Sequence, residues 1–155
     1  MVWTGSSAHF TTSPFFFKST VTAHSYSNLI ETHLLPSLRR KRKLSSTIFQ
    51  QDGAPAHYSV KVRELLTKTF GDRAIGRGLT VKWPPRSPDL SPLDYWLKDR
   101  IHHQGKPHDI GEMKTRITEE ASKITREEMI AAINNLHQRC ELVLEVNGGH
   151  FEQFL

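Results

Sequence analysis

Residues 83–97 have the sequence WPPRSPDLSPLDYWL, which places four prolines and two aspartates in one short segment. Each proline fixes φ and removes a backbone donor, so the segment fits neither the interior of a helix nor a central strand. We predict a rigid extended loop that brings Asp94 to the first turn of a helix. A carboxylate delivered by such a stiff approach has a defined position, as a residue of a functional site requires.

A second acid, Asp52, follows the strand-like run TIFQQ at residues 47–51 and precedes the turn-forming Gly53. In an open α/β sheet, functional groups lie just beyond the carboxyl ends of the strands. The sequence therefore predicts that Asp52 is the partner of Asp94.

The two segments together resemble mariner-like transposases. QDGAPAH at 51–57 and WPPRSPDLSPLDY at 83–95 look like the second and third acidic motifs of that family, and NGGHFEQFL at 147–155 resembles its carboxyl terminus. The resemblance implies an α/β, ribonuclease-H-like mixed sheet with flanking helices, in one partial DDE/D catalytic domain over residues 1–155. It also implies Mg²⁺- or Mn²⁺-dependent cleavage and joining of DNA strands at a two-metal site.

The same resemblance implies two departures from the family. The first catalytic aspartate of the family lies on a strand upstream of Val2, and the helix-turn-helix segment that recognises transposon ends lies before that strand. We therefore expect a sheet truncated at its first strand, marginal stability, and DNA binding without cleavage by this chain alone. One alternative is a transposase-derived binding or interaction protein without chemistry, and another is a nuclease that takes its missing carboxylate from a second chain.

Asp52 and Asp94 suit magnesium because hard cations prefer oxygen ligands. Two-metal phosphodiester chemistry requires carboxylates that converge on ions about 4 Å apart, so we expect these two carboxylates within about 4–8 Å of each other. The alternatives are structural: Asp52 is also the expected acid of an Asx-turn, and Asp94 of a helix start near the positive end of the dipole. Asp89 fits a turn better than a metal site.

Several basic residues are candidate DNA contacts. His57 follows Asp52 closely and either neighbours the metals or DNA, or is a hydrogen-bonded structural residue. The run RRKRK is exposed because adjacent like charges cannot pack together. It is a solvated loop, a phosphate contact or a nuclear import signal, and the last reading gives a nuclear location. The candidate DNA-binding residues are Arg39, Arg40, Lys41, Arg42, Lys43, His57 and Arg86.

Composition limits the other functions. The 155 residues carry a formal net charge of +5 and a pI of about 9.5, which favours an anionic partner. Cys140 is the only cysteine, so no internal disulfide forms, and no His or Cys spacing predicts zinc. No apolar run approaches the roughly 20 residues of a membrane span, and residues 1–13 lack a basic targeting region. We expect neither a membrane nor a small molecule as partner.

The remaining elements follow from periodicity and caps. A hairpin is expected from strands at residues 2–4 and 14–18 with a turn at 5–7, and a helix from Thr22 that Pro36 ends. A strand at 79–83 follows a helix that ends near Phe70. The apolar positions of that helix fall on one face and are Val62, Leu65, Leu66, Thr69 and Phe70. Two helices that start at the capping residues Asp109 and Thr125 form a carboxyl-terminal helical part at 109–147, which covers the sheet or, alternatively, forms a homodimer contact. Ile110 is expected on the apolar face of the first helix, and the second stops at residues 148–149, which are both glycine.

Overall fold

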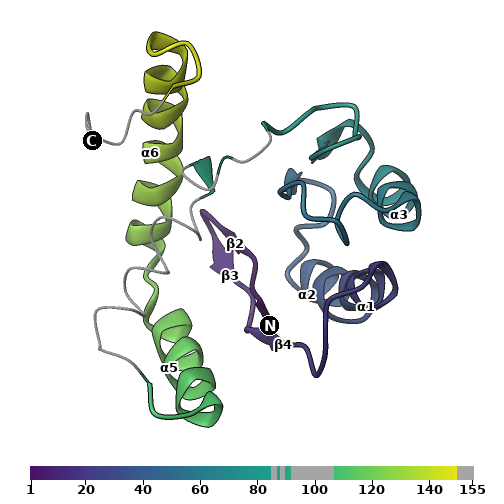
Figure 1. Cartoon of the computed structure of the whole chain (residues 1–155), viewed down its shortest axis with the longest axis vertical. Helices are drawn as coiled ribbons and strands as arrows, with labels where there is room; N and C mark the ends of the chain where they lie inside the picture. The colour runs from purple at the N-terminus through teal and green to yellow at the C-terminus, as the bar shows by residue number, and fades with distance from the viewer. Residues whose placement is uncertain (85–86, 88–89, 92–106, 150–155) are drawn as a thin grey trace. The chain divides into compact units, whose positions relative to one another are not determined.

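The computed structural model describes residues 1–84, 87, 90, 91 and 107–149, which belong to two compact units. The Asp52 unit contains Met1 and residues 17–87, and the hairpin unit contains residues 2–16 and 88–155. Both units combine short strands with helices, so the predicted α/β composition is confirmed (Figure 1).

The Asp52 unit begins with a long helical arm. It consists of α1 (Ala23–Leu29), the π-helical η1 (Ile30–Leu34) and α2 (Leu35–Arg40). Thr22 caps α1 as predicted, because its side chain accepts from the Ser25 N–H while the Ser25 hydroxyl accepts from the Thr22 N–H. Tyr26 lies on the buried face of this arm.

The prediction that Pro36 ends the first helix is wrong. Pro36 lies in the first turn of α2, and the helix continues to Arg40. A proline inside an α-helix removes a hydrogen bond and presses on the carbonyl four residues earlier. Here η1 widens the turn just before the proline, since the Leu35 N–H bonds to the Ile30 carbonyl five residues back. The chain thus passes the proline without leaving the helix.

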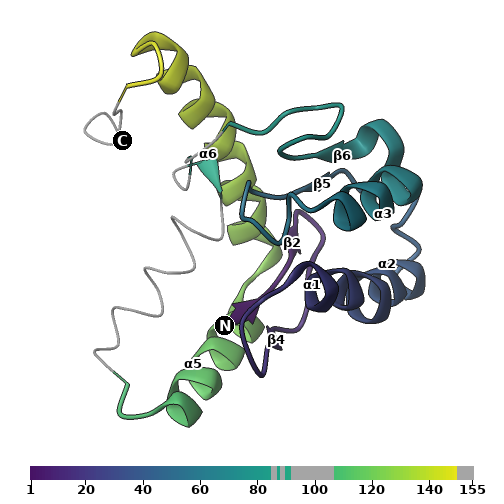
Figure 2. The ribbon, with the colours of Figure 1, turned by 45° about the vertical axis from the view of Figure 1, so that its right-hand side comes forward.

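A small parallel sheet lies beside α3 in the same unit (Figure 2). Strand β5 (Phe49–Gln50) pairs with β6 (Ala74–Ile75), and Val81 forms a single bridge to Ile75. Helix α3 (Val60–Phe70) and the 3-10 turn η2 (Gly71–Arg73) connect the two strands. The predicted strand at 79–83 is thus reduced to one bridge. Strand β6 was not predicted, because two residues between glycine-containing turns carry no readable periodicity.

The predicted apolar face of α3 forms the core of this unit. Val62, Leu66 and Phe70 are each at most 2% exposed, and the Phe70 ring stacks on Phe49 with 5.2 Å between centroids. Burying each such side chain contributes about 1.5–3 kcal/mol, so this face fixes α3 against β5. The first turn of α3 lies at the end of the loop that carries Asp52.

The hairpin unit contains two nested antiparallel pairs. Strand β1 (Val2–Trp3) pairs with β4 (Phe15–Phe16), and β2 (Ser6–Ser7) pairs with β3 (Phe10–Thr11) between them. The outer hairpin was predicted, but residues 5–7 are not its turn. The Thr12 N–H donates to the Gly5 carbonyl at 2.7 Å, which extends the ladder and moves the turn beyond β2. The phenylalanines of β4, Phe15 and Phe16, are half-buried.

Helices α5 (Ile110–Lys123) and α6 (Arg126–Glu145) form the predicted carboxyl-terminal helical part. Asp109 caps α5 by accepting from the Glu112 N–H at 2.8 Å. The His108 N–H and Arg116 hold the pKa of the Glu112 carboxyl below its usual value. Helix α6 contacts β2, and Met129 is its most deeply buried large side chain. Ile110, expected on the apolar face of α5, is 76% exposed because it is the first residue of the helix.

The end of α6 is set by a Schellman motif. Asn147 adopts φ +52, its N–H bonds to the Leu144 carbonyl, and the Gly148 N–H bonds to the Val143 carbonyl at 2.8 Å. The predicted glycine stop is therefore confirmed, with Asn147 as the left-handed residue. No helix in the described part of the chain combines the length and apolar character that crossing a membrane requires.

Candidate functional site

Asp52 lies at the carboxyl end of β5, and residues 76–78 lie at the carboxyl end of the neighbouring β6. Because the two strands are parallel, both loops are at the same edge of the sheet, which we call the carboxyl edge. The loops touch, since a Cβ placed on Gly53 would lie 3.2 Å from Cδ of Arg77. A glycine at this position allows the Arg77 side chain to cross close to the Asp52 loop.

The Asp52 carboxylate is oriented by two donors. Its Oδ1 accepts from the Ala54 N–H at 3.1 Å and lies 2.5 Å from Nδ1 of His57. An ionised carboxylate can only accept hydrogen bonds, so Nδ1 is the donor in its contact with an ionised Asp52. The side chain of Asp52 is 54% exposed and that of His57 19%. The Asx-turn alternative is therefore part of the structure, and it leaves the carboxylate accessible from solvent.

A buried hydrogen-bond network supports this loop from below. Gln51, 5% exposed, accepts from the Tyr26 hydroxyl at 3.0 Å and donates from Nε2 to the His57 carbonyl at 3.0 Å. The rings of Tyr26 and His57 lie with centroids 4.1 Å apart. The network joins α1, the end of β5 and the Asp52 loop. It was missed in the sequence, where the only signal was a glutamine at a position that alternation assigns to the buried side of a strand.

Asp52 fits one ligand position of a magnesium or manganese ion, because it presents a hard, accessible oxygen at a strand end. Its predicted partner, Asp94, lies outside the described residues, as does Arg86, so the expected 4–8 Å separation stays a prediction. Within the described ranges, no group of three or more His, Cys, Asp or Glu side chains could hold a metal ion.

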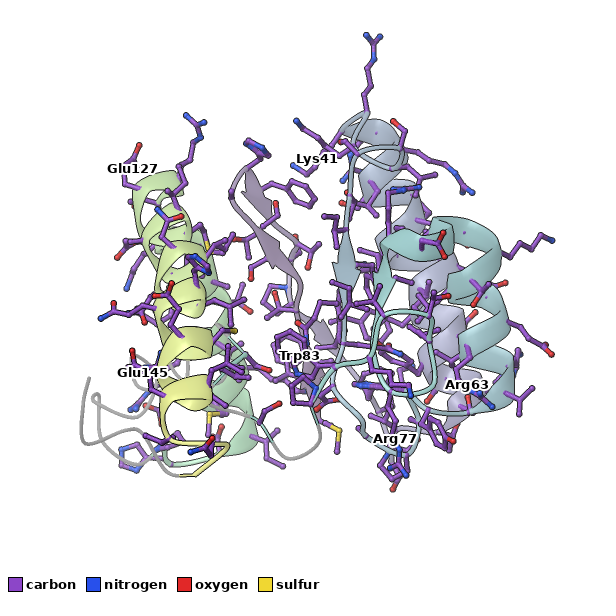
Figure 3. The ribbon with its side chains drawn as sticks, turned by 90° about the horizontal axis from the view of Figure 1, so that it is seen from above. Lys41, Arg63, Arg77, Trp83, Glu127 and Glu145 are labelled. Atoms are coloured by element: carbon purple, nitrogen blue, oxygen red, sulfur yellow. The ribbon has the colours of Figure 1, made fainter. Side chains whose placement is uncertain are left out.

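The basic run occupies the other end of the Asp52 unit. Arg39 and Arg40 form the last turn of α2, so the predicted basic loop 39–43 begins only at Lys41. Cations are favourable there because the carboxyl end of a helix carries a partial negative charge. The chain then enters β5 from its amino end, where Arg73 donates to the Thr47 carbonyl at 2.7 Å. Figure 3 accordingly shows Lys41 at one end of this unit, far from Arg63 and Arg77.

Three side chains at the carboxyl edge were not identified from the sequence. The guanidinium carbons of Arg63 and Arg77 lie 4.9 Å and 4.4 Å from the centroid of the Tyr58 ring. Tyr58 comes from the Asp52 loop, Arg63 from the first turns of α3, and Arg77 from the loop after β6. No sequence spacing brings these residues together, and only the fold does.

The fold is that of the catalytic domain of a known enzyme. No protein-family profile and no curated protein sequence matches the chain. Among solved structures, it is similar to the Mos1 transposase catalytic domain with raltegravir and manganese, at 27% identity and a TM-score of 0.76 over 97% of this chain and 76% of that one. The chain is also similar to a crystal structure of the Mos1 mariner transposase catalytic domain, at 26% identity and a TM-score of 0.75 over 97% of this chain and 74% of that one.

A third similar structure is a larger assembly. The Mos1 transposase paired-end complex with the left transposon end matches at 27% identity and a TM-score of 0.73, over 94% of this chain and 42% of that one. The chain therefore spans about three quarters of the Mos1 catalytic domain and less than half of the longer Mos1 chain. The ribonuclease-H-like fold predicted from the sequence is confirmed.

Proposed function

We propose that this chain, a mariner-like transposase domain, binds DNA and supplies Asp52 and Asp94 as metal-binding carboxylates of a strand-cleavage and strand-transfer site. The observation that carries the proposal is the Asp52 carboxylate, exposed at the carboxyl edge and oriented by two hydrogen bonds. Its setting in the fold of Mos1, which was crystallised with manganese, with magnesium and with transposon-end DNA, supports the same role.

The chain's own residues prepare this carboxylate for metal and DNA. The Ala54 N–H and His57 both act on Oδ1, which fixes the plane of the carboxylate at the exposed carboxyl edge. Such supporting hydrogen bonds orient metal ligands and are worth about 10–100-fold in metal affinity or activity. When bound, the metal supplies activation of the attacking oxygen and stabilisation of the leaving oxygen. Gln51 holds the loop so that both donors stay in place.

We propose further that residues 1–155 bind DNA without cleaving it by themselves. Two ions about 4 Å apart repel each other and require carboxylates that converge on both. Asp52 and Asp94 would provide two such groups, and a third carboxylate would be needed to hold both ions. The cations of this basic chain provide sequence-independent affinity that falls with salt. In a cell, the basic run 39–43 would also act as a nuclear import signal.

The alternative is a transposase-derived DNA-binding or interaction protein without catalytic activity. It is favoured by the two separate groups of cations in the Asp52 unit, which suit DNA binding without any metal. The two proposals differ in metal binding, because only the first requires Asp52 and Asp94 to bind divalent ions.

The test measures metal binding and cleavage separately. Loss of the free Mn²⁺ signal in electron paramagnetic resonance reports binding by the parent, by Asp52→Asn and by Asp94→Asn. Asp72→Asn is the matched control, because Asp72 is an exposed acid on η2. We expect both site variants to bind less Mn²⁺ and the control to bind as the parent does. Equal binding by all four proteins would overturn the metal role and leave the alternative.

A plasmid-nicking assay with Mg²⁺ or Mn²⁺ then tests the inactivity of the chain alone. We expect no metal-dependent nicking by the parent. Nicking that both Asp52→Asn and Asp94→Asn abolish would contradict this. It would mean that the third carboxylate comes from this chain or from its partner in a homodimer.

A further inference from the structure

Tyr58, Arg63 and Arg77 form a cluster at the carboxyl edge that the metal site does not use. Both guanidinium carbons lie within 5 Å of the same ring centroid, at 4.9 Å and 4.4 Å. The two positive charges are therefore closer together than one Debye length, about 10 Å at 0.1 M salt. Like charges so placed repel, and the attraction of each guanidinium group to the Tyr58 ring opposes this repulsion.

No acid neutralises this cluster within the described residues. Neither arginine forms an ion pair there, and Arg63 Nε is buried without a hydrogen-bond acceptor. Two guanidinium groups with donors in a fixed plane and no carboxylate between them are suited to an anion with several acceptor oxygens.

The backbone beneath the cluster is shaped to fit it. Gly78 has φ +73, and a Cβ there would lie 2.6 Å from the Tyr58 ring and 3.0 Å from Cδ of Arg63. The ring and the Arg63 stem thus lie directly on the glycine backbone, and any side chain would displace them. Arg77, the residue before this glycine, also crosses Gly53 next to Asp52. The contact between Arg77 and Gly53 therefore fixes the position of the cluster relative to the Asp52 loop.

We propose that Arg63 and Arg77 together bind one backbone phosphate of a DNA strand beside Asp52, with Tyr58 as the positioning residue for both guanidinium groups. This inference rests on the proposed function and adds the residues that hold the strand at the site. The cluster lies at the sheet edge where Asp52 is exposed, so a strand whose phosphodiester reaches Asp52 passes the two arginines. A phosphate offers the several acceptor oxygens that two planar guanidinium groups require.

The test is the affinity of the whole chain for a short fluorescently labelled DNA duplex, measured by anisotropy in EDTA over a range of salt concentrations. We expect Arg63→Gln and Arg77→Gln each to weaken binding about tenfold, as removal of a charged hydrogen bond does. The slope of log affinity against log salt should fall by about 0.9 for each phosphate that the variant no longer neutralises. Lys68→Gln, an exposed cation on the same helix as Arg63, is the matched control and should change affinity less.

Variants of Tyr58 test whether DNA binding depends on the position of the two guanidinium groups as well as on their charge. Tyr58→Phe keeps the ring and should bind DNA as the parent does, whereas Tyr58→Leu should weaken binding although no charge is removed. Arg77→Lys keeps the charge without the planar donors and should also bind more weakly. Circular dichroism melts of each variant show whether it is folded, and the Arg77 variants test the proposal if Arg63→Gln unfolds.

The outcomes are distinguishable. A folded parent that binds no DNA would overturn the proposed function and this inference together. A parent that binds DNA, with unchanged affinity and salt slope in the Arg63 and Arg77 variants, would overturn this inference alone. A decrease in affinity for Lys68→Gln equal to that for Arg77→Gln would also overturn it, because net charge would then explain the effect.

Discussion

The Asp52 unit carries two groups of cations that are built in opposite ways. The basic run 39–43 is contiguous in the sequence and lies at the end of α2, where its first four residues are exposed. The cluster of Tyr58, Arg63 and Arg77 is scattered in the sequence and is assembled by α3 and the loop after β6. The first group can be read directly from the sequence, whereas the second is brought together only by the fold.

This difference follows from what each environment does to charge. Exposed cations are screened by water and salt, so the basic run contributes attraction over a distance but little orientation. Arg77 is also exposed, but the guanidinium carbons of Arg63 and Arg77 both lie within 5 Å of the Tyr58 ring centroid, so their planar donors are more closely positioned than those of the basic run. We therefore expect the basic run to affect the rate at which DNA associates, and the cluster to affect the position of the bound DNA strand.

Gly78→Ala should have the largest effect of the three changes, because it displaces the side chains of the cluster while both arginines keep their charge. A positive φ strains alanine and its Cβ would overlap Tyr58, and each effect costs about 1–3 kcal/mol. We expect a lower urea midpoint and weaker DNA binding. Gly71→Ala is the control, because Gly71 also has a positive φ but a Cβ added there would meet nothing within 4 Å. Gly71→Ala should lower the free energy of unfolding, while its folded fraction should bind DNA as the parent does. If Gly71→Ala and Gly78→Ala weakened DNA binding equally, the overlap between the Gly78 Cβ and Tyr58 would not be the cause.

Gln51→Leu removes the buried hydrogen-bond network next to the Asp52 loop. It removes the hydrogen bond from the Tyr26 hydroxyl to Gln51 and the bond from Gln51 to the His57 carbonyl, which costs about 1–3 kcal/mol in the free energy of unfolding. Tyr26→Phe removes the first of these two bonds from its other side, so the double variant should be less destabilised than the sum of the two single variants. Urea unfolding of all four proteins measures the coupling, and strict additivity would show that the hydrogen bond does not contribute.

Arg39→Gln with Arg40→Gln should have the smallest effect on stability. Both residues are exposed at the end of α2, so the free energy of unfolding should change by less than about 0.5 kcal/mol. DNA affinity should fall at low salt and approach that of the parent at high salt, because the contribution is long-range. An effect on affinity that persists at high salt would place a direct phosphate contact at the basic run.

Local signals in the sequence predicted the helices well. Thr22, Asp109 and Thr125 each cap a helix, because a cap is a hydrogen bond between residues a few positions apart. The face of α3 was equally readable, since burial on one side of a helix repeats with its turn. The placement of Asp52 after a strand followed from the strand-like run at residues 47–51 and from the turn-forming Gly53 after it.

The parts that the sequence did not predict depend on contacts between distant segments. Strand β6 has two residues and exists because β5 offers it a ladder. The Gln51 network joins a helix, a strand end and a loop, and the arginine cluster joins a loop, a helix and a second loop. None of these has a period or a spacing, so only the folded arrangement reveals them. Asp94 and Arg86 remain predictions, because they lie outside the described residues.

The widened turn η1 has a consequence for how this chain can vary. It inserts one residue into an otherwise regular helix, and that extra residue is what lets the helix carry Pro36. Deleting the residue would return the proline to a position where it blocks the helix, whereas replacing the proline would leave a widened turn with no reason to persist. Each change alone is unfavourable and the two together restore a plain helix. The length of this arm and its proline are therefore coupled, and substitution there is not independent of insertion.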